Sequence, residues 1–155
     1  MIVIREETFT TLNELKTRED YQKPLTLPVL KDVLLQYYPG CFLGGTIDEK
    51  NVLTFHHIEP LRTALISNKK LDTLENGALL GRLEHNIYNL FEQKDIKSAK
   101  MLKEFFLYFK ETLDYEEQER IRQYVDERVY ELGFEIKEEK HIYRLTKQKW
   151  IKKGS

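Results

Sequence analysis

Apolar side chains recur at helical spacing in two segments of the first two thirds of the chain. Between residues 28 and 38 they recur every three or four residues, and Pro28 and Pro39-Gly40 mark the two ends of the pattern. This pattern predicts a short helix from about 28 to 38. A second stripe predicts a helix within 77–93, in spite of its two glycines. That stripe consists of Leu80, Leu83, Ile87 and Phe91.

Shorter apolar runs around polar turns predict two β-hairpins. Residues 41–59 contain two apolar segments on either side of the polar turn 48–51, and Pro60 ends the second segment. Residues 134–146 show the same arrangement near the C-terminus. The segment 96–132, which precedes this second hairpin, carries two helical patterns that are separated near Asp114 and ended by Gly133.

These elements predict an α+β fold, a mainly helical single domain. We expect an N-terminal helical extension (1–40), a central strand-and-helix unit (41–95) and a C-terminal helical hairpin with a β-hairpin and a basic tail (96–155), all packed as one body. The length of 155 residues and the hydrophobic share of 41% are enough for a sizeable core, which excludes disordered and fibrous classes.

The charge balance gives the whole molecule no positive electrostatic field that would attract a polyanion. The chain has 25 Lys and Arg against 26 Asp and Glu, for a net charge of -1. Nucleic acid would therefore be held locally, and the basic end that contains Lys147 and Lys149 is a candidate for that contact. The single cysteine, Cys41, indicates a reducing compartment, so we expect a cytoplasmic protein. No apolar run has the length of a membrane span, and no membrane partner is expected.

Chemistry-bearing residues gather in the central unit. Three of the four histidines lie there, as the adjacent pair His56-His57 at the end of a predicted strand and as His85 in the following helix. On a helix, Arg82, His85 and Asn89 share the side opposite the apolar stripe. An imidazole nitrogen and an amide oxygen one turn apart can reach one divalent ion. The planar guanidinium group of Arg82 can donate two hydrogen bonds to a phosphate.

These segments resemble the HNH endonuclease family, the ββα-metal finger nucleases. The resemblance rests on the segments CFLGG, FHHIEP, LENGALL and GRLEH, which run from Cys41 to about Asn89. It implies a ββα-metal finger in which His56 and His85 are metal ligands and His57 is the general base. It also implies that Asn76 orients the base and its loop, and that Asn89 stands where some members have a third ligand.

The sequence departs from the family at the four cysteines with which many members hold a structural zinc. Cys41 is the only one present, and Gly44, Gly81 and Glu84 occupy the other three places. We therefore expect no structural zinc and a finger held by hydrophobic packing, with 101–109 as the clamp. A regular strand would point His56 and His57 to opposite faces, so a shared site requires the strand to end or bend there.

The resulting hypothesis is a metal-dependent DNA endonuclease of phage, mobile-element or restriction type. One divalent ion is expected, Mg²⁺ as first choice with Mn²⁺, Ni²⁺ or Zn²⁺ as alternatives. The expected partner is double-stranded DNA, with Arg82, Lys69 and Lys70 on its phosphates, and a homodimer is left open. The alternative is a non-catalytic DNA- or protein-binding module built on a degenerate finger. A winged helix over 97–146 is disfavoured by the acidic side chains of 116–132, which would face phosphates.

Overall fold

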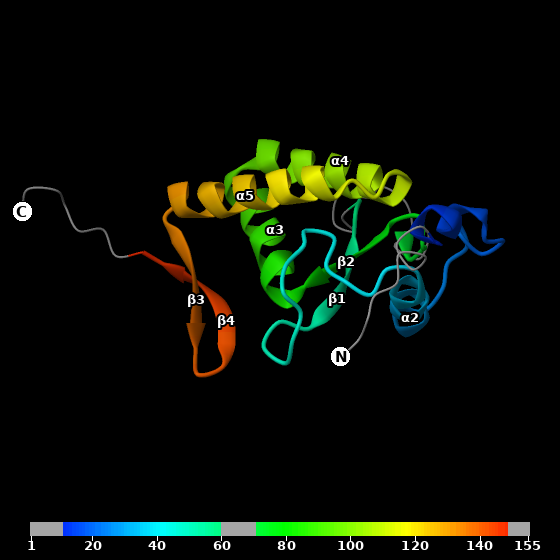
Figure 1. Cartoon of the computed structure of the whole chain (residues 1–155), viewed down its shortest axis with the longest axis horizontal. Helices are drawn as coiled ribbons and strands as arrows, with labels where there is room; N and C mark the ends of the chain where they lie inside the picture. Colours follow the sequence, from blue (N-terminus) through cyan, green and yellow to red (C-terminus); the bar gives the residue numbers. More distant parts are fainter. Residues whose placement is uncertain (1–10, 60–70, 149–155) are drawn as a thin grey trace, which may run out of the picture.

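A computed structural model describes residues 11–59 and 71–148, in which helices and two antiparallel strand pairs alternate along the chain (Figure 1). About half of these residues are helical, so the predicted α+β class and helical content are confirmed. In chain order the elements are η1 (Thr11–Thr17), α2 (Leu27–Tyr37), β1 (Leu53–His57), β2 (Gly77–Gly81), α3 (Arg82–Lys94), α4 (Ile96–Glu111), α5 (Tyr115–Glu131), β3 (Phe134–Glu139) and β4 (Ile142–Lys147).

The central unit runs strand, strand, helix. β1 pairs with β2 in an antiparallel register that sets Leu53 opposite Gly81 and His57 opposite Gly77. α3 begins at the residue directly after β2. All five residues of β2 are buried. β2 therefore lies inside the molecule and positions the start of α3, while β1 is half-buried.

The predicted hairpin within residues 41–59 is wrong in its pairing. Asp48 and Asn51 form only an isolated bridge, and the partner of β1 comes from residues 77–81. The Asp48 carboxylate accepts the backbone N–H groups of Lys50 at 2.8 Å and Asn51 at 3.1 Å. A side chain that satisfies its own turn in this way makes a local loop, with no need for flanking strands.

The predicted helix within 77–93 begins later than expected, because residues 77–81 form β2 and α3 starts at Arg82. A five-residue buried apolar run has no period that separates strand from helix. Gly77 lies close against β1, since a Cβ atom there would be 2.5 Å from the Phe55 ring. Of the predicted stripe, Leu83, Ile87 and Phe91 are buried in α3, and Leu80 is buried in the strand.

The remaining predicted elements agree with the structure. α2, α4, α5 and the β3–β4 hairpin lie within a few residues of their predicted ranges. The turn of that hairpin, Lys140-His141, has positive φ angles of 48° and 65°, as tight hairpin turns require. No helix within 11–59 and 71–148 combines the length and the apolar character that a membrane span needs.

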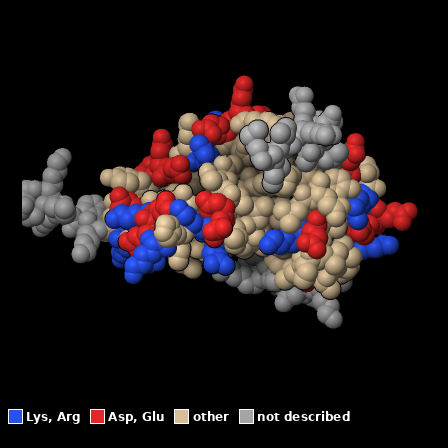
Figure 2. All heavy atoms as spheres, turned by 60° about the horizontal axis from the view of Figure 1, so that its bottom comes forward, with Lys and Arg blue, Asp and Glu red and all other residues tan. Residues whose placement is uncertain are grey.

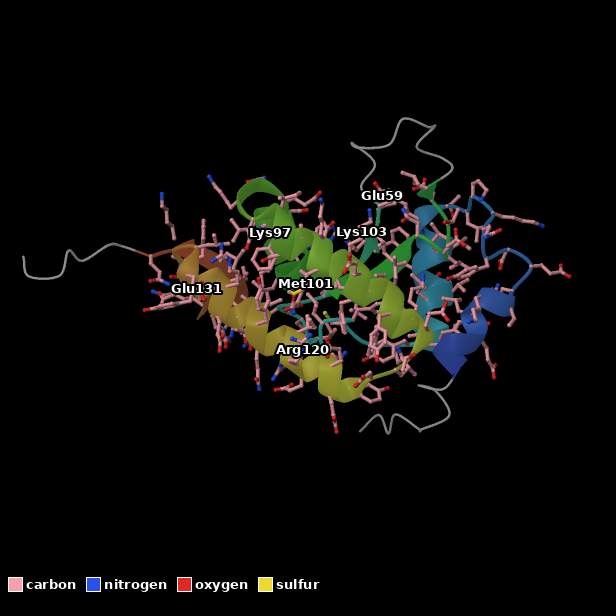
Figure 3. All side chains as sticks on the ribbon, turned by 90° about the horizontal axis from the view of Figure 1, so that it is seen from above. Glu59, Lys97, Met101, Lys103, Arg120 and Glu131 are labelled. Carbon is pink, nitrogen blue, oxygen red and sulfur yellow. The ribbon has the colours of Figure 1, made fainter. Side chains whose placement is uncertain are left out.

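An aromatic core joins α4 to the central unit, and α4 and α5 together cover one side of it (Figure 3). The Phe42 ring is fully buried and lies 6.4 Å from the Phe106 ring and 5.5 Å from the Phe109 ring. In agreement with the predicted clamp in 101–109, Leu102, Phe105, Phe106 and Phe109 are all buried. Packing on α4 thus holds the strand pair and α3 from one side.

Candidate functional site

Two histidine rings converge between β1 and α3. Nδ1 of His56 lies 3.4 Å from Nε2 of His85, and the ring centroids are 5.0 Å apart. His56 points into the molecule, where its ring packs edge-on against Tyr88 and against Phe106 of α4. The predicted ligand pair is therefore brought together by the pairing of β1 with β2, which sets the first turn of α3 beside β1.

Thr54 fixes the tautomer of His85. Its hydroxyl donates to the carbonyl of Leu80 at 2.8 Å, so its oxygen can only accept from Nδ1 of His85, 3.0 Å away. His85 therefore carries its proton on Nδ1 and aims the lone pair of Nε2 at His56. A metal-binding histidine in a protein is held in the same way, by a partner on its other ring nitrogen.

Burial keeps both rings neutral near pH 7. Desolvation, followed by the charges of His85 and His57, lowers the pKa of His56 to about 3. Desolvation and then the charge of His57 lower the pKa of His85. Nε2 of His56 is buried without a hydrogen-bond partner within the described part of the chain. Neutral imidazoles are the form that binds a cation.

His57 faces a different neighbour, as the alternation of a strand requires. It is the last residue of β1, and its Nε2 lies 2.8 Å from Oδ1 of Asp72. Its ring packs against that of Phe55, two residues earlier on the same strand, with the centroids 4.9 Å apart, whereas His56 faces His85. The charge of His57 nevertheless lowers the pKa of both His56 and His85, so the three imidazoles lie within electrostatic reach of one another.

Asn76 ties together the two chain segments that follow β1 and precede β2. Its side-chain oxygen accepts the backbone N–H of Glu59 at 2.7 Å, and its Nδ2 donates to the carbonyls of Glu59 and Leu71, each at 3.2 Å. Its own N–H donates to the Thr73 hydroxyl. Asn76 thus holds the loop next to His57.

The other predicted site residues lie at the surface or outside the described residues. Arg82 and Asn89 are exposed on α3, one at its first residue and the other one turn beyond His85. Lys147 is exposed at the end of β4. Lys69, Lys70 and Lys149 fall outside the ranges that the structure describes. Charges of both signs are intermingled on the face in Figure 2, so this face has no field of one sign.

Contacts join Cys41, Gly81 and Glu84, three of the four positions where the resemblance would place zinc-binding cysteines. Cys41 donates from its thiol to Oε1 of Glu84 at 3.6 Å and accepts the backbone N–H of Gly81 at 3.5 Å. Burial, and then the charge of Glu84, raises the pKa of Cys41 to about 12, so the thiol keeps its proton. Nδ2 of Asn51 donates to the same Glu84 oxygen at 2.8 Å. Oδ1 of Asn51 accepts the N–H of Leu83 and so stabilises the start of α3.

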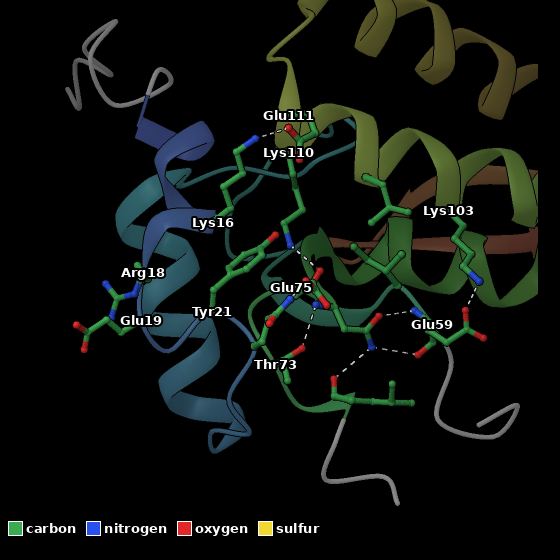
Figure 4. Close-up of a pocket in the computed structure, with 15 residues that line it drawn as sticks. Lys16, Arg18, Glu19, Tyr21, Glu59, Thr73, Glu75, Lys103, Lys110 and Glu111 are labelled. Atoms are coloured by element: carbon green, nitrogen blue, oxygen red, sulfur yellow. Dashed lines mark hydrogen bonds and ion pairs between the residues drawn. The ribbon is translucent and has the colours of Figure 1, made fainter. Parts of the chain in front are cut away.

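A buried lysine supports the segment that carries Asn76. Nζ of Lys110 donates to the carbonyls of Leu74, Glu75 and Gly77 at 2.6 to 3.0 Å. Figure 4 shows Lys110 beside Glu75. The side chain lines a cleft of about 860 Å³ between η1, residues 71–76 and α4. Desolvation lowers the pKa of Lys110 to about 7. Opposite charges pair across the cleft, with Lys16 on Glu111 and Lys103 on Glu59.

Sequence patterns gave no signal for Thr54, Asp72 or Lys110, because each acts through a partner that is distant along the chain.

Across the described part of the chain, no group of three or more His, Cys, Asp or Glu side chains is arranged to hold a metal ion. The described residues therefore supply two imidazole nitrogens as metal ligands at this site.

Comparison with protein-family models, curated proteins and solved structures returned no match.

Proposed function

We propose that the chain is a metal-dependent endonuclease of the HNH type, which hydrolyses phosphodiester bonds in DNA. The observation that carries the proposal is the facing pair of neutral imidazole nitrogens of His56 and His85, 3.4 Å apart. Two nitrogens at about 2.1 Å from one ion lie roughly 3.0 to 3.4 Å apart in octahedral or tetrahedral coordination. The donor set therefore fits a single divalent ion whose other positions are left to water and phosphate oxygens.

The tautomer of His85 adds to this support. With Nδ1 committed to Thr54, Nε2 is the ring nitrogen of His85 that can bind a cation, and it faces Nδ1 of His56. When bound, the ion would act as a Lewis acid on the phosphate and the leaving oxygen. Imidazole ligands favour transition ions such as Ni²⁺ or Zn²⁺ over Mg²⁺ and Mn²⁺, which prefer oxygen.

The order of elements also supports the proposal. β1, β2 and α3 follow one another as strand, strand and helix. The histidine pair ends β1 and His85 lies in the first turn of α3, in the order that the resemblance implies. In the proposed reaction His57 takes a proton from the attacking water. Asn76 holds the loop beside His57, and Arg82 at the exposed start of α3 is available to a phosphate.

Plasmid cleavage tests the proposal. Supercoiled plasmid is incubated with the purified chain and Mg²⁺, Mn²⁺, Ni²⁺ or Zn²⁺, and the nicked and linear products are separated on a gel. We expect cleavage with at least one ion and none with EDTA. Cleavage that persists in EDTA would contradict the metal dependence.

If the chain binds DNA and metal but cleaves no nucleic acid with any ion, the result would favour the alternative function, a non-catalytic binding module. Linear and branched DNA and RNA belong in the same assay, because the described residues do not select among these substrates. Size-exclusion chromatography with light scattering, with and without DNA, tests the homodimer.

A further inference from the structure

Asp72 makes a direct contact with the histidine that we propose as the general base. Its Oδ1 lies 2.8 Å from Nε2 of His57, and the two side chains are 28% and 17% exposed. An ionised carboxylate can only accept a hydrogen bond. Nε2 of His57 must therefore carry a proton, and in the neutral ring the lone pair is on Nδ1.

The backbone on both sides of the Asp72 carboxylate is fixed. The carbonyl of Asp72 accepts the N–H of Leu25 at 2.9 Å, which ties it to the chain just before α2. The carbonyl of the preceding residue, Leu71, accepts from Nδ2 of Asn76. Asn76 thus acts on His57 through one residue, because it holds the peptide that carries Asp72.

We propose that Asp72 is the positioning residue for His57: it fixes the Nε2–H tautomer and leaves Nδ1 as the atom that receives the proton. This inference rests on the proposed function. As the water oxygen forms its bond to phosphorus, its O–H bond breaks and the proton moves to Nδ1. The bond from phosphorus to the leaving oxygen breaks, and that oxygen takes a proton from solvent. The imidazolium that forms is stabilised by its charge-assisted hydrogen bond to Asp72.

The first test is an NMR signature that does not depend on activity. In ¹⁵N-labelled wild type, we expect a ring N–H of His57 on Nε2 that exchanges slowly with water, assigned by its loss in His57→Ala. In Asp72→Ala this proton should exchange too fast to be observed. Asp20→Ala is the matched control, because Asp20 pairs with Arg18 at 2.8 Å and its side chain is 30% exposed. A His57 proton on Nδ1 in wild type, or one unchanged in Asp72→Ala, would overturn the proposal.

The second test separates positioning from folding. With the ion that supports plasmid cleavage, Asp72→Asn should lower kcat about 10- to 1000-fold while KM for DNA and the melting temperature stay near those of wild type. Asp20→Asn should change neither constant. A fall that appears only in KM, or an unchanged kcat, would overturn the role of Asp72. An inert wild type that shows the protected Nε2 proton would instead overturn the proposed function and leave the hydrogen bond in place.

Discussion

Nε2 of His85 faces Nδ1 of His56 at 3.4 Å because Thr54, two residues before His56 on β1, holds the far side of the His85 ring. Residues 54 and 56 share one face of a strand, so a single strand supplies both the proposed ligand and the group that orients its partner. The pairing of β1 with β2 sets α3 at the distance that this arrangement needs.

Thr54→Val should weaken metal binding without unfolding the protein. Valine has nearly the same shape as threonine but cannot accept the Nδ1 proton of His85, so the ring loses its orientation. Loss of such a supporting hydrogen bond typically costs about 10- to 100-fold in metal affinity. Titration calorimetry with Ni²⁺ or Zn²⁺ measures the change. Thr46→Val, at an exposed position, is the control. Equal affinities in wild type and Thr54→Val would argue against a metal on His85.

His57→Ala should abolish cleavage and preserve binding. A general base lowers the energy of the transition state and contributes little to the ground state, so the loss is expected in kcat, at about 100- to 10,000-fold. Metal and DNA affinities should stay near those of wild type. The matched control is His141→Ala, which removes an exposed histidine in the β3–β4 turn. A cleavage rate in His57→Ala equal to that of wild type would remove His57 from the mechanism.

Asn76→Ala should destabilise the fold. Its side chain makes three hydrogen bonds to Glu59 and Leu71, and their backbone groups lose these partners. The expected fall in the free energy of unfolding is about 1 to 3 kcal/mol. Urea denaturation measures it. Asn86→Ala makes the same change on the exposed face of α3 and should stay within about 0.5 kcal/mol of wild type. Equal losses in both variants would show that the Asn76 hydrogen bonds are not specifically stabilising.

Lys110 should make stability depend on pH. Desolvation lowers its pKa from 10.5 to about 7 in the folded state, while Glu75 and Glu111 act to raise it. The carbonyls of Leu74, Glu75 and Gly77 also favour the ammonium form. From pH 7 to 10.5 the unfolded chain binds more protons at this side chain than the folded chain, so this contribution to the free energy of unfolding rises with pH.

The variant Lys110→Met isolates this effect. Urea denaturation of wild type and variant at several values from about pH 6 to 9 gives two curves of unfolding free energy. Above pH 7 the free energy of unfolding of wild type should rise relative to that of the variant. The slope of this difference should be at most about 1.4 kcal/mol per pH unit, which corresponds to one proton. Below pH 7 the two curves should run parallel, with the variant displaced by its lost hydrogen bonds. Parallel curves over the whole range would show that Lys110 keeps its proton.

The sequence by itself determined the elements that a local pattern can specify. The helices α2, α4 and α5 and the C-terminal hairpin followed from periodicity and from the residues that interrupt it, which are Pro28, Pro39-Gly40, Asp114 and Gly133. The proximity of His56 to His85 followed from the motif, because a histidine at the end of β1 and one in the first turn of α3 meet once the strands pair.

The tertiary structure alone decided how distant segments pair. β1 joins residues 77–81 instead of its own neighbours, because Asp48 closes a local turn and the glycines of β2 admit Phe55 and Glu84 side chains close to the backbone. It also decided that Asp72 bonds to His57 and that Glu84 joins Cys41 and Asn51. Such contacts join residues 15 to 43 positions apart. The periodicity of one segment does not predict which distant segment it will contact.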